Sequence, residues 1–441
     1  MQLPQAAEYC IRSLEAAGYQ AYAVGGCVRD SLLGLTPADY DLCTDAKPQE
    51  ISQVFAGHQL LHHGEKHGTV GVVLEGQVFE ITTFRTEGGY EDSRHPNWVA
   101  FVADVEADLA RRDFTVNAMA YNPRIGYVDP FGGELDLKHR LLRTVGDPQA
   151  RFREDALRIL RGARFSARFR LTPEPATKEA MERLAPLMDN LARERVFDEL
   201  CKLLSSATAE DLLTFVPLLT QVIPELAPSV GFQQHSPHHR YDVFTHTAHV
   251  VEAVPQEPGL RWAALLHDIG KPACFTRDTD GRGHFKGHAQ ASADMADAIL
   301  LRLKAPAALR QQVTELIGLH MTKLEPDKKL LRRRLGKLGR ERLLELLALQ
   351  EADMGSKGTG KPEEMAQFPQ IRGLLAEVLA EDACFSIKDL AINGWDLQQL
   401  GFAPGPDIGK CLSWLLGQVQ DEALPNERNV LLRTVKELLE D

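Results

Sequence analysis

The chain has 441 residues and a formal net charge of -12, with 44% hydrophobic and 25% charged residues, which is a composition typical of globular proteins. This length is too great for one ordinary hydrophobic core and predicts two to four domains. The sequence contains no apolar run near the roughly 20 residues that a membrane span requires. Its first residues favour an amphipathic helix over a secretory signal, so we expect a cytoplasmic protein that does not contact a membrane.

The seven cysteines are scattered and form no Cys-x-x-Cys pair, which favours reduced thiols over disulfides or structural zinc. Two segments are strongly basic although the chain as a whole is acidic. Residues 151–170 hold seven arginines against two acidic residues, and residues 328–342 hold eight basic residues against one glutamate. Such patches can follow a phosphate backbone, and solvated helix faces are the alternative for both.

A glycine turn stands near the start of the chain. The sequence predicts a strand over residues 22–24, a turn at Gly25 and Gly26, and a helix from residue 27 to about residue 34. Glycine lets the backbone come close to a ligand at a helix N-terminus, where amide groups attract phosphate. Arg29, one turn into the helix, adds positive charge, so the segment suits a nucleoside triphosphate.

A pair of aspartates follows this helix. We expect a second strand that carries Asp39 and Asp41, and because side chains alternate along a strand, both carboxylates should point the same way. Mg²⁺ is the natural ion to hold two such carboxylates together with substrate phosphates. Glu80, on a strand predicted over residues 78–85, could be a third acidic group, and a cross-strand polar contact is the alternative.

The ordered combination of this turn and the aspartate pair resembles the signature of the nucleotidyltransferase superfamily that includes CCA-adding tRNA nucleotidyltransferases and bacterial poly(A) polymerases. The segment RRDFTVNAMA over residues 111–120 is similar to the second motif of that family. The resemblance implies that Arg112 meets the triphosphate. Asp113 and Asn117, four residues apart and so on one predicted helix face, could hold the ribose.

Residues 86–110 are rich in glycine and charge and predict a mobile loop with a weak strand at 98–102 and a helix start. In CCA-adding enzymes a loop at this point is associated with the switch in nucleotide choice, and CC-adding relatives have a shortened version. Here the stretch is not shortened. Residues 128–145 resemble the next family motif, with a turn at Gly132 and Gly133 followed by a helix.

From residue 147 onward the sequence predicts helices. In REDALRILRGARFSARF we expect a base-reading helix face at i, i+3 spacing, and its members are Asp155, Arg158, Arg161 and Arg164. An aspartate accepts from an exocyclic amine while a neighbouring arginine donates to the ring nitrogen beside it, an edge that cytosine and adenine share and that uracil and guanine lack. The EDxxRxxR pattern of CCA-adding enzymes is similar. Arg195 and Glu199, in the last neck motif, should brace this helix.

A second constellation begins near residue 231. Its members are His246, His267, Asp268, His288, His320 and Asp353. This order resembles the HD phosphohydrolase superfamily, and imidazoles with carboxylates suit a transition metal or Mg²⁺. We assign His246, His267, Asp268 and Asp353 as the ligands, with Lys271 able to reach a phosphate. Hydrogen-bonded core histidines are the alternative.

The end of the chain carries no catalytic constellation. Residues 354–369 predict a linker or mobile loop, and residues 385–419 resemble the C-terminal helical region of bacterial CCA-adding enzymes. That region either binds the tRNA elbow or packs against the rest of the chain.

The motifs together predict an α+β nucleotidyltransferase head with a small mixed sheet, then an all-α neck, an HD domain and a C-terminal helical region. Their expected bounds are 1–146, 147–228, 229–356 and 357–441. The resemblance implies a CCA-adding enzyme that uses Mg²⁺, CTP and ATP, acts on tRNA and releases pyrophosphate. A divalent transition metal in the HD site could add hydrolysis of 2′,3′-cyclic or other phosphoesters.

Three alternatives remain open at this point. The first is a poly(A) polymerase or A-adding tRNA nucleotidyltransferase, the second an HD phosphohydrolase with a vestigial polymerase head, and the third a non-catalytic RNA-binding module.

Overall fold

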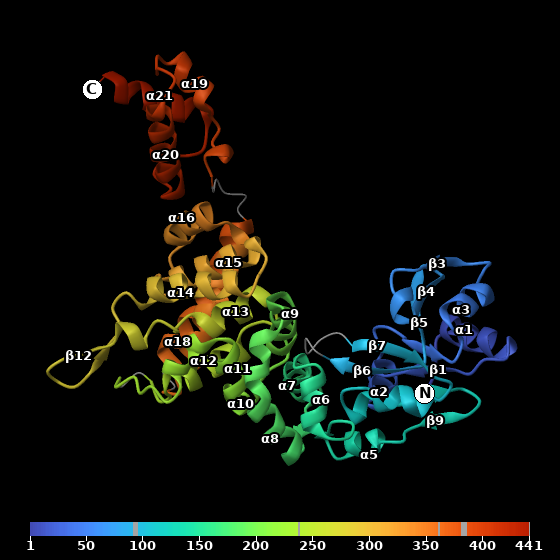
Figure 1. Ribbon diagram of the computed structural model, residues 1–441. Coiled ribbons are helices and arrows are strands. Elements are labelled where there is room, and N and C mark those ends of the chain that lie inside the picture. The colour runs from blue at the N-terminus through green and yellow to red at the C-terminus, as the bar shows by residue number, and fades with distance from the viewer. Residues whose placement is uncertain (91–95, 237–238, 360–361, 381–385, 441) are drawn as a thin grey trace. The chain divides into compact units, whose positions relative to one another are not determined.

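The computed structural model describes residues 1–90, 96–236, 239–359, 362–380 and 386–440 (Figure 1). Its internal contacts divide the chain into two units, Met1–Ala227 with Arg302–Ala305 and Pro228–Leu301 with Pro306–Asp441. The prediction of an α+β N-terminal part followed by helical parts is confirmed. Among the described helices, none combines the length and apolarity needed to cross a bilayer.

A seven-stranded mixed sheet forms the centre of the first unit, in the order β3-β4-β5-β2-β1-β8-β9. The β2–β5 pair is parallel and the other neighbouring pairs are antiparallel. The strands are β1 (Ala21–Val24), β2 (Leu42–Thr44), β3 (Gln59–Leu61), β4 (Thr69–Leu74), β5 (Gln77–Thr83), β8 (Ala120–Asn122) and β9 (Gly126–Val128).

Short helices accompany the sheet, and an apolar core that includes Tyr22, Cys43 and Phe84 joins it to α4. The helix that begins at Pro48 is capped by the Glu50 carboxylate, which accepts the free backbone N–H of Lys47 at 2.7 Å. The helices are α1 (Gln5–Ala16), α2 (Gly26–Leu32), α3 (Pro48–Val54), α4 (Val105–Ala110) and α5 (Gly133–Lys138), with 3₁₀ turns at Glu65–His67 and Thr115–Asn117.

Of the segment predicted over residues 86–110, the weak strand at 98–102 and the helix start are confirmed, but residues 86–90 form a strand where a loop was expected, and that part of the prediction is wrong. Strands β6 (Arg85–Tyr90) and β7 (Pro96–Phe101) pair antiparallel as a hairpin separate from the main sheet. Helix α4 follows, with Asp104 accepting from the backbone N–H of Glu106 at 3.0 Å. Residues 91–95, on which part of the expected loop falls, lie outside the described residues.

Helices make up most of the rest of the first unit. They are α6 (Pro148–Glu154), α7 (Leu157–Phe169), α8 (Pro175–Leu184), α9 (Arg193–Leu204), α10 (Ala209–Thr214) and α11 (Val216–Val222), with 3₁₀ turns at Ala185–Asn190 and Pro224–Ser229. A two-residue parallel ladder, β10 (Leu141–Leu142) with β11 (Thr172–Pro173), ties the end of α7 back to the preceding segment. The expectation that strands end before residue 147 is therefore wrong here, and it is wrong again at a two-residue pair in the second unit.

The second unit is helical apart from the two-residue strands β12 (Thr276–Arg277) and β13 (Gly283–His284). Its helices are α12 (Val243–Ala253), α13 (Pro258–Leu266), α14 (His288–Arg302), α15 (Ala307–Leu319), α16 (Lys328–Leu338), α17 (Arg340–Gly355), α18 (Pro362–Ala380), α19 (Gly394–Gln399), α20 (Pro406–Gln420) and α21 (Arg428–Glu440), with 3₁₀ turns at Pro272–Cys274 and Ile387–Asp389.

The linker predicted over residues 354–369 is mostly helix, so that prediction is wrong. Helix α17 continues to Gly355, and α18 begins at Pro362 and runs through Pro369. Burial of apolar side chains three or four residues apart outweighs the glycine and proline signals, since Phe368, Ile371, Leu375 and Val378 are all buried. The helical region expected over 385–419 is confirmed from residue 386 onward, and α19 to α21 share a leucine-rich core.

Candidate active site and a buried histidine–aspartate cluster

A cavity of about 520 Å³ opens in the first unit, and it collects every site residue predicted from the first 170 positions. Eight arginines and four aspartates line it, so its wall is strongly polar and rich in positive charge. Its lining residues are Gly25, Gly26, Arg29, Asp39, Asp41, Arg111, Arg112, Asp113, Asn117, Asp155, Arg158, Arg161, Arg164, Phe165, Arg168 and Arg195. Such a wall is complementary to a polyanion.

The two candidate metal-binding aspartates stand just before β2 and not within it, which corrects the predicted strand position. The backbone carbonyl of Asp41 still accepts from the N–H of Val24 at 3.0 Å, so the extended pairing with β1 continues past the strand end. Although both aspartates are partly open to solvent, desolvation by the surrounding protein and the charge of Asp39 raise the pKa of Asp41 to about 6. A divalent cation would relieve this strain between like charges.

Glu80 lies near this pair. Parallel pairing sets Leu42 of β2 opposite Ile81 of β5. Asp41 comes one residue before Leu42, just outside β2, and Glu80 comes one residue before Ile81, so the two acidic residues stand at neighbouring positions. The charge of Glu80 contributes to the raised pKa of Asp41, which brings a third carboxylate into the same electrostatic environment.

The backbone geometry of the turn requires glycine at position 25. Gly25 has φ +76° and its N–H donates to the carbonyl of Met119 at 3.0 Å. A Cβ added at Gly25 would lie 2.8 Å from Nη1 of Arg112, so the arginine packs directly over the turn. Only glycine at this position lets the Arg112 guanidinium reach the cavity beside the start of α2.

The buried side chain of Arg29 is held mainly by protein groups. Its Nε and Nη2 donate to Oδ1 of Asp30 at 2.8 and 2.6 Å, and its Nη1 donates to Oδ1 of Asn117 at 2.5 Å. The guanidinium also lies 4.1 Å from the ring centre of Phe169 on α7. Arg29 therefore keeps few donors for a ligand and links the glycine turn to the base-reading helix.

Asp113 and Asn117 come together, but not on a helix face as predicted. Residues 115–117 form a 3₁₀ turn, and Nδ2 of Asn117 donates to Oδ1 of Asp113 at 3.1 Å. Arg161 donates to Oδ2 of Asp113 from Nε and Nη2, at 2.8 and 2.6 Å. Burial alone would raise the pKa of Asp113, but Arg161 and Asn117 hold it well below its ordinary value, so the carboxylate is ionised and occupied.

The predicted helix face at Asp155 is interrupted. Helix α6 ends at Glu154, and Asp155 has an extended backbone and accepts from the N–H of Leu157 at 3.0 Å, so it caps α7. Asp155 and Arg158 both line the cavity, but the structure gives them different partners. Asp155 bonds to Arg195 at 3.1 Å, and Arg158 bonds to Glu154 at 2.7 Å.

The brace from α9 is present as the sequence suggested. Oε2 of Glu199 lies 2.7 Å from Nε of Arg164, and both side chains are nearly buried. Arg195 reaches Asp155 from the same helix. Arg195 also lines the cavity, as do Arg111, Phe165 and Arg168, which the sequence reasoning did not single out. Their only sequence signal was membership of the arginine-rich stretches around residues 111 and 161.

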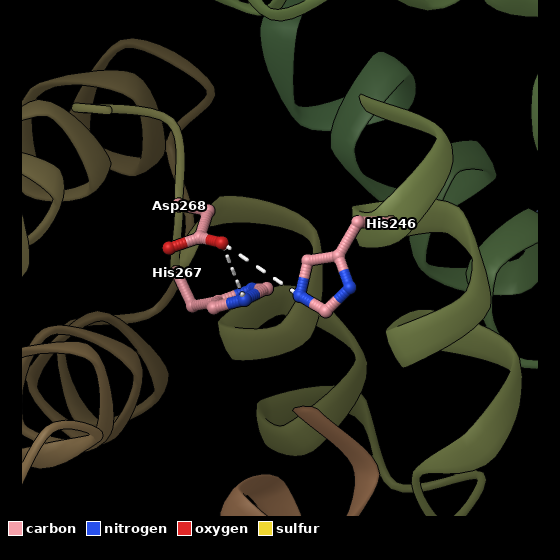
Figure 2. Close-up of side chains that lie close together, drawn as sticks. All are labelled: His246, His267 and Asp268. Carbon is pink, nitrogen blue, oxygen red and sulfur yellow. Dashed lines mark ion pairs between the residues drawn. The ribbon is translucent and has the colours of Figure 1, made fainter. Parts of the chain in front are cut away.

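The second unit contains a buried cluster drawn from five helical segments. His246 comes from α12, His267 and Asp268 follow α13, His288 opens α14, His320 ends α15, and Asp353 lies on α17. The predicted ligands are thus together, and Figure 2 shows the Asp268 carboxylate facing the rings of His246 and His267.

Interactions between opposite charges stabilise this cluster. Burial would raise the pKa of Asp268, but His267 and Lys271 hold it well below its ordinary value. Nζ of Lys271 lies 2.6 Å from Oδ2 of Asp268 and donates to Oε1 of Gln234 at 2.9 Å. Burial lowers the pKa of His320 to about 4, so that ring is neutral at physiological pH and has a nitrogen available as a ligand.

Three family models match successive parts of the chain. The Poly A polymerase head domain matches residues 21–143. The probable RNA and SrmB-binding site of polymerase A matches residues 170–229, and the putative tRNA nucleotidyltransferase domain 2 matches residues 286–435. The first match contains the glycine turn and both candidate metal-binding aspartates.

Relatives match over nearly the full length. The CCA-adding enzyme of Latilactobacillus sakei is 34% identical over 431 residues, which cover 97% of this chain and 96% of the relative. The CCA-adding enzyme of Levilactobacillus brevis is 33% identical over 425 residues, 96% of each chain. The crystal structure of the Bacillus stearothermophilus CCA-adding enzyme in complex with CTP superposes with a TM-score of 0.74 at 28% identity, covering 100% of this chain and 98% of that one. Because the two relatives from Latilactobacillus sakei and Levilactobacillus brevis match over nearly the full length of both sequences, the protein belongs to the family of CCA-adding enzymes.

Proposed function

We propose that Asp39 and Asp41 bind the divalent metal with which this CCA-adding enzyme adds C, C and A to the 3′ end of tRNA from CTP and ATP. The observation that carries the assignment is the cavity itself. The cavity is lined by two aspartates that have no basic partner among the described residues, by the glycine turn and by eight arginines. The relatives of the chain are CCA-adding enzymes. The solved relative bound to CTP supports a nucleotide in this cavity.

Different residues of the cavity would bind the metal, the triphosphate and the ribose. When bound between Asp39 and Asp41, Mg²⁺ would activate the primer 3′-hydroxyl and offset charge on the phosphate. Arg112, packed over the glycine turn, would bind the triphosphate, while Arg29 orients the turn from behind. Asp113 and Asn117 would fix the ribose side of the cavity, since their own hydrogen bonds keep both side chains rigid.

Base selection is assigned to the start of α7. Asp155 would accept from the exocyclic amine of cytosine or adenine, and Arg158 would donate to the adjacent ring nitrogen. Arg161 and Arg164 support this edge of the cavity because each is tied to a buried acid, Asp113 or Glu199. Bonds from Glu154 and Arg195 orient the two base-reading side chains independently.

The test uses tRNA that ends before the CCA tail. Incubation with CTP alone should add two residues, and CTP with ATP should add three, whereas ATP alone should extend this primer poorly. A poly(A) polymerase would instead extend with ATP alone and without a defined end. Asp39→Ala and Asp41→Ala should each abolish incorporation while circular dichroism remains unchanged, and incorporation within about tenfold of the parent would exclude the metal assignment.

A second activity is favoured by the histidine–aspartate cluster. We propose that His246, His267, Asp268 and Asp353 bind a divalent transition metal that supports phosphoester hydrolysis, with a 2′,3′-cyclic phosphate at a damaged RNA 3′ end as the substrate to test first. The observation in its favour is that His246, His267 and Asp268 are buried together beside a cavity of about 260 Å³, and that Asp353, which lines this cavity, lies 2.9 Å from His246. Water opens the cyclic phosphate by breaking one ester bond and leaves a monophosphate, and breaking the bond to the 3′ oxygen would free the 3′-hydroxyl that nucleotide addition requires.

His267→Ala combined with Asp268→Ala should remove this hydrolysis and leave CCA addition intact, because the polymerase aspartates belong to the other unit. The assay measures cyclic-phosphate turnover with added Mn²⁺, Ni²⁺, Co²⁺ or Mg²⁺. If the parent chain neither binds metal nor hydrolyses the substrate with any of these ions, the cluster is a set of hydrogen-bonded core histidines.

A further inference from the structure

One arginine of the polymerase cavity has no acidic partner. Of the eight arginines that line the cavity, Arg168 is the one to which the described residues offer no ion pair and no side-chain hydrogen bond. Nearby arginines differ, since Arg164 is paired with Glu199 and Arg170, just past the end of α7, is paired with Asp211 at 2.8 Å. The Arg168 side chain is exposed, so its guanidinium is open to a ligand.

Stabilising the end of α7 is the alternative role for this charge, because Arg168 lies in the last turn of the helix, where cations are favourable. Other groups already satisfy that end. Nη1 of Arg140 donates to the carbonyl of Phe169 at 3.1 Å, and the N–H of Leu171 donates to the carbonyl of Ser166 at 3.0 Å. The closing carbonyls of α7 therefore do not depend on Arg168.

Arg168 continues the stripe of α7 that faces the cavity. Its members follow one another at spacings of three, four and three residues, which places them on one side of a helix: Arg158, Arg161, Phe165 and Arg168. Ten residues separate the first from the last, so they lie about 15 Å apart along the helix axis. This separation is comparable with the length of an extended nucleoside triphosphate. The proposed base-reading residues stand at one end of the stripe, and Arg168 stands at the other.

The far end of the stripe lies beside the glycine turn. The guanidinium of Arg168 lies 5.1 Å from the ring centre of Phe169, and that of Arg29 lies 4.1 Å from the same ring. Nη2 of Arg29 in turn lies 3.6 Å from the position that a Cβ on Gly26 would take. Burial lowers the pKa of Arg29, and the charge of Arg168 lowers it further. Two cations therefore meet here, and only Arg29 has an acidic partner, Asp30.

An anion with several oxygens would complete this end of the cavity. Arg29 already donates to Asp30 and Asn117, so the free donors belong to Arg168. A guanidinium presents a planar fork of N–H groups that matches two oxygens of a phosphate. In a nucleotide whose base lies at the start of α7, the groups that extend farthest from the base are the β- and γ-phosphates.

We propose that Arg168 binds the terminal phosphates of the incoming nucleotide. This assignment rests on the proposed addition of CTP and ATP in the same cavity and extends the binding site by one residue. Because both nucleotides carry the same triphosphate, Arg168 contributes equally to both and takes no part in choosing the base. Pyrophosphate, which keeps the two terminal phosphates, is bound by the same side chain.

Nucleotide binding to the full chain without tRNA tests the contact directly, by isothermal titration calorimetry in the presence of Mg²⁺. Arg168→Gln should weaken binding of CTP and of ATP by about tenfold, the order expected for the loss of a charged hydrogen bond at an exposed position. CMP, which lacks the terminal phosphates, should bind the variant and the parent equally. Arg168→Lys keeps the charge but loses the fork, so its affinity for CTP should lie between the two.

Kinetics of CMP addition to tRNA lacking its tail supply the second measurement. Arg168→Gln should raise KM for CTP and the half-inhibitory concentration of pyrophosphate, each by about tenfold. KM for tRNA and the preference for CTP over UTP should not change. The matched control is Arg170→Gln, which removes a neighbouring cation that does not line the cavity and should keep the nucleotide KM of the parent.

The possible outcomes separate this contact from the rest of the reaction. Unchanged CTP binding in Arg168→Gln would overturn the role and leave the proposed function standing if the parent adds CMP. A rise in KM for tRNA alone would overturn it in favour of a contact with the RNA backbone, and equal weakening of CTP and CMP would overturn it in favour of a structural role. If the parent adds no CMP, the proposed function fails, whereas a loss confined to CTP and ATP binding would still support the phosphate contact.

Discussion

The raised pKa of Asp41 predicts how metal binding at the proposed polymerase site would change as the pH falls. A carboxylate must lose its proton before it can bind Mg²⁺, so the proton and the metal compete for this side chain. Desolvation and the charge of Asp39 raise its pKa to about 6 from an ordinary value of 3.8. The concentration of free Mg²⁺ that gives half-maximal CTP incorporation should therefore increase below pH 6.

The size of the effect follows from the fraction of Asp41 that is ionised. With a pKa of about 6, that fraction falls from nearly all at pH 8 to about one-eleventh at pH 5, so half-saturation should rise roughly tenfold. An aspartate with its ordinary pKa would give a change of less than about twofold over the same range. Saturating Mg²⁺ should compensate for the loss at low pH.

The assay measures incorporation of CMP into tRNA lacking its tail, at a fixed concentration of the Mg–CTP complex and varied free Mg²⁺. Deprotonation of the primer affects the maximal rate, whereas competition at Asp41 affects half-saturation, so the two are separated. A half-saturating concentration that stays constant between pH 8 and pH 5 would refute the reasoning.

Glu80→Gln refines this test, because the Glu80 charge contributes to the raised pKa of Asp41. If Glu80 acts only through its charge, the variant should shift the dependence to lower pH and leave half-saturation at pH 8 unchanged. If Glu80 is itself a metal ligand, half-saturation at pH 8 should rise. Glu75→Gln, in the turn before β5, is the matched control and should behave as the parent does.

Three further outcomes are expected. Asp155→Asn should relax exclusion of UTP and GTP by about 5- to 150-fold, the equivalent of the roughly 1–3 kcal/mol of a bidentate base contact, and Arg195→Met should produce a smaller change in the same direction, both measured as ratios of kcat/KM. Gly25→Ala should raise KM for CTP and ATP together because it strains a positive φ and displaces the overlying arginine, whereas Gly26→Ala, whose Cβ meets nothing closer than 3.6 Å, should fold normally. Deletion within residues 88–96 should spare CTP addition and impair the final ATP addition, and equal loss of both would indicate a folding role.

Sequence reasoning predicted which residues gather around the cavity better than it predicted their local structure. Residue order was sufficient to predict that Asp113 and Asn117 lie together, because family motifs preserve spacing. The helix assumed for them is instead a 3₁₀ turn. Asp155 breaks its helix because its side chain bonds to the N–H of Leu157 more favourably than the backbone of a continued helix could allow. Local side-chain competition of this kind has no periodic signature.

Contacts between segments that are distant in the sequence could not be predicted, for a different reason. The Asp113–Arg161 bond joins residues 48 positions apart, and Arg29 meets Asn117 across 88 positions. Neither pairing can be derived from spacing, because the first depends on how α7 lies against the segment of Asp113 and the second on how α2 packs against the 3₁₀ turn at Thr115–Asn117. In the histidine cluster, the order of the histidines and aspartates could be read from the sequence, but the division of imidazoles between the two oxygens of Asp268 depends on how the helices pack.

The polymerase cavity shows what such long-range pairing accomplishes. Eight arginines around one space would repel one another, yet seven of them have an acidic partner: Asp30, Asp108, Asp113, Asp155, Glu154 or Glu199. These partners fix the orientation of the guanidinium groups before a ligand arrives. Among the described residues that line the cavity, the charged groups without such a partner are Arg168, Asp39 and Asp41. The unsatisfied charges are therefore one cation and an aspartate pair, and a triphosphate bound together with its divalent metal satisfies both.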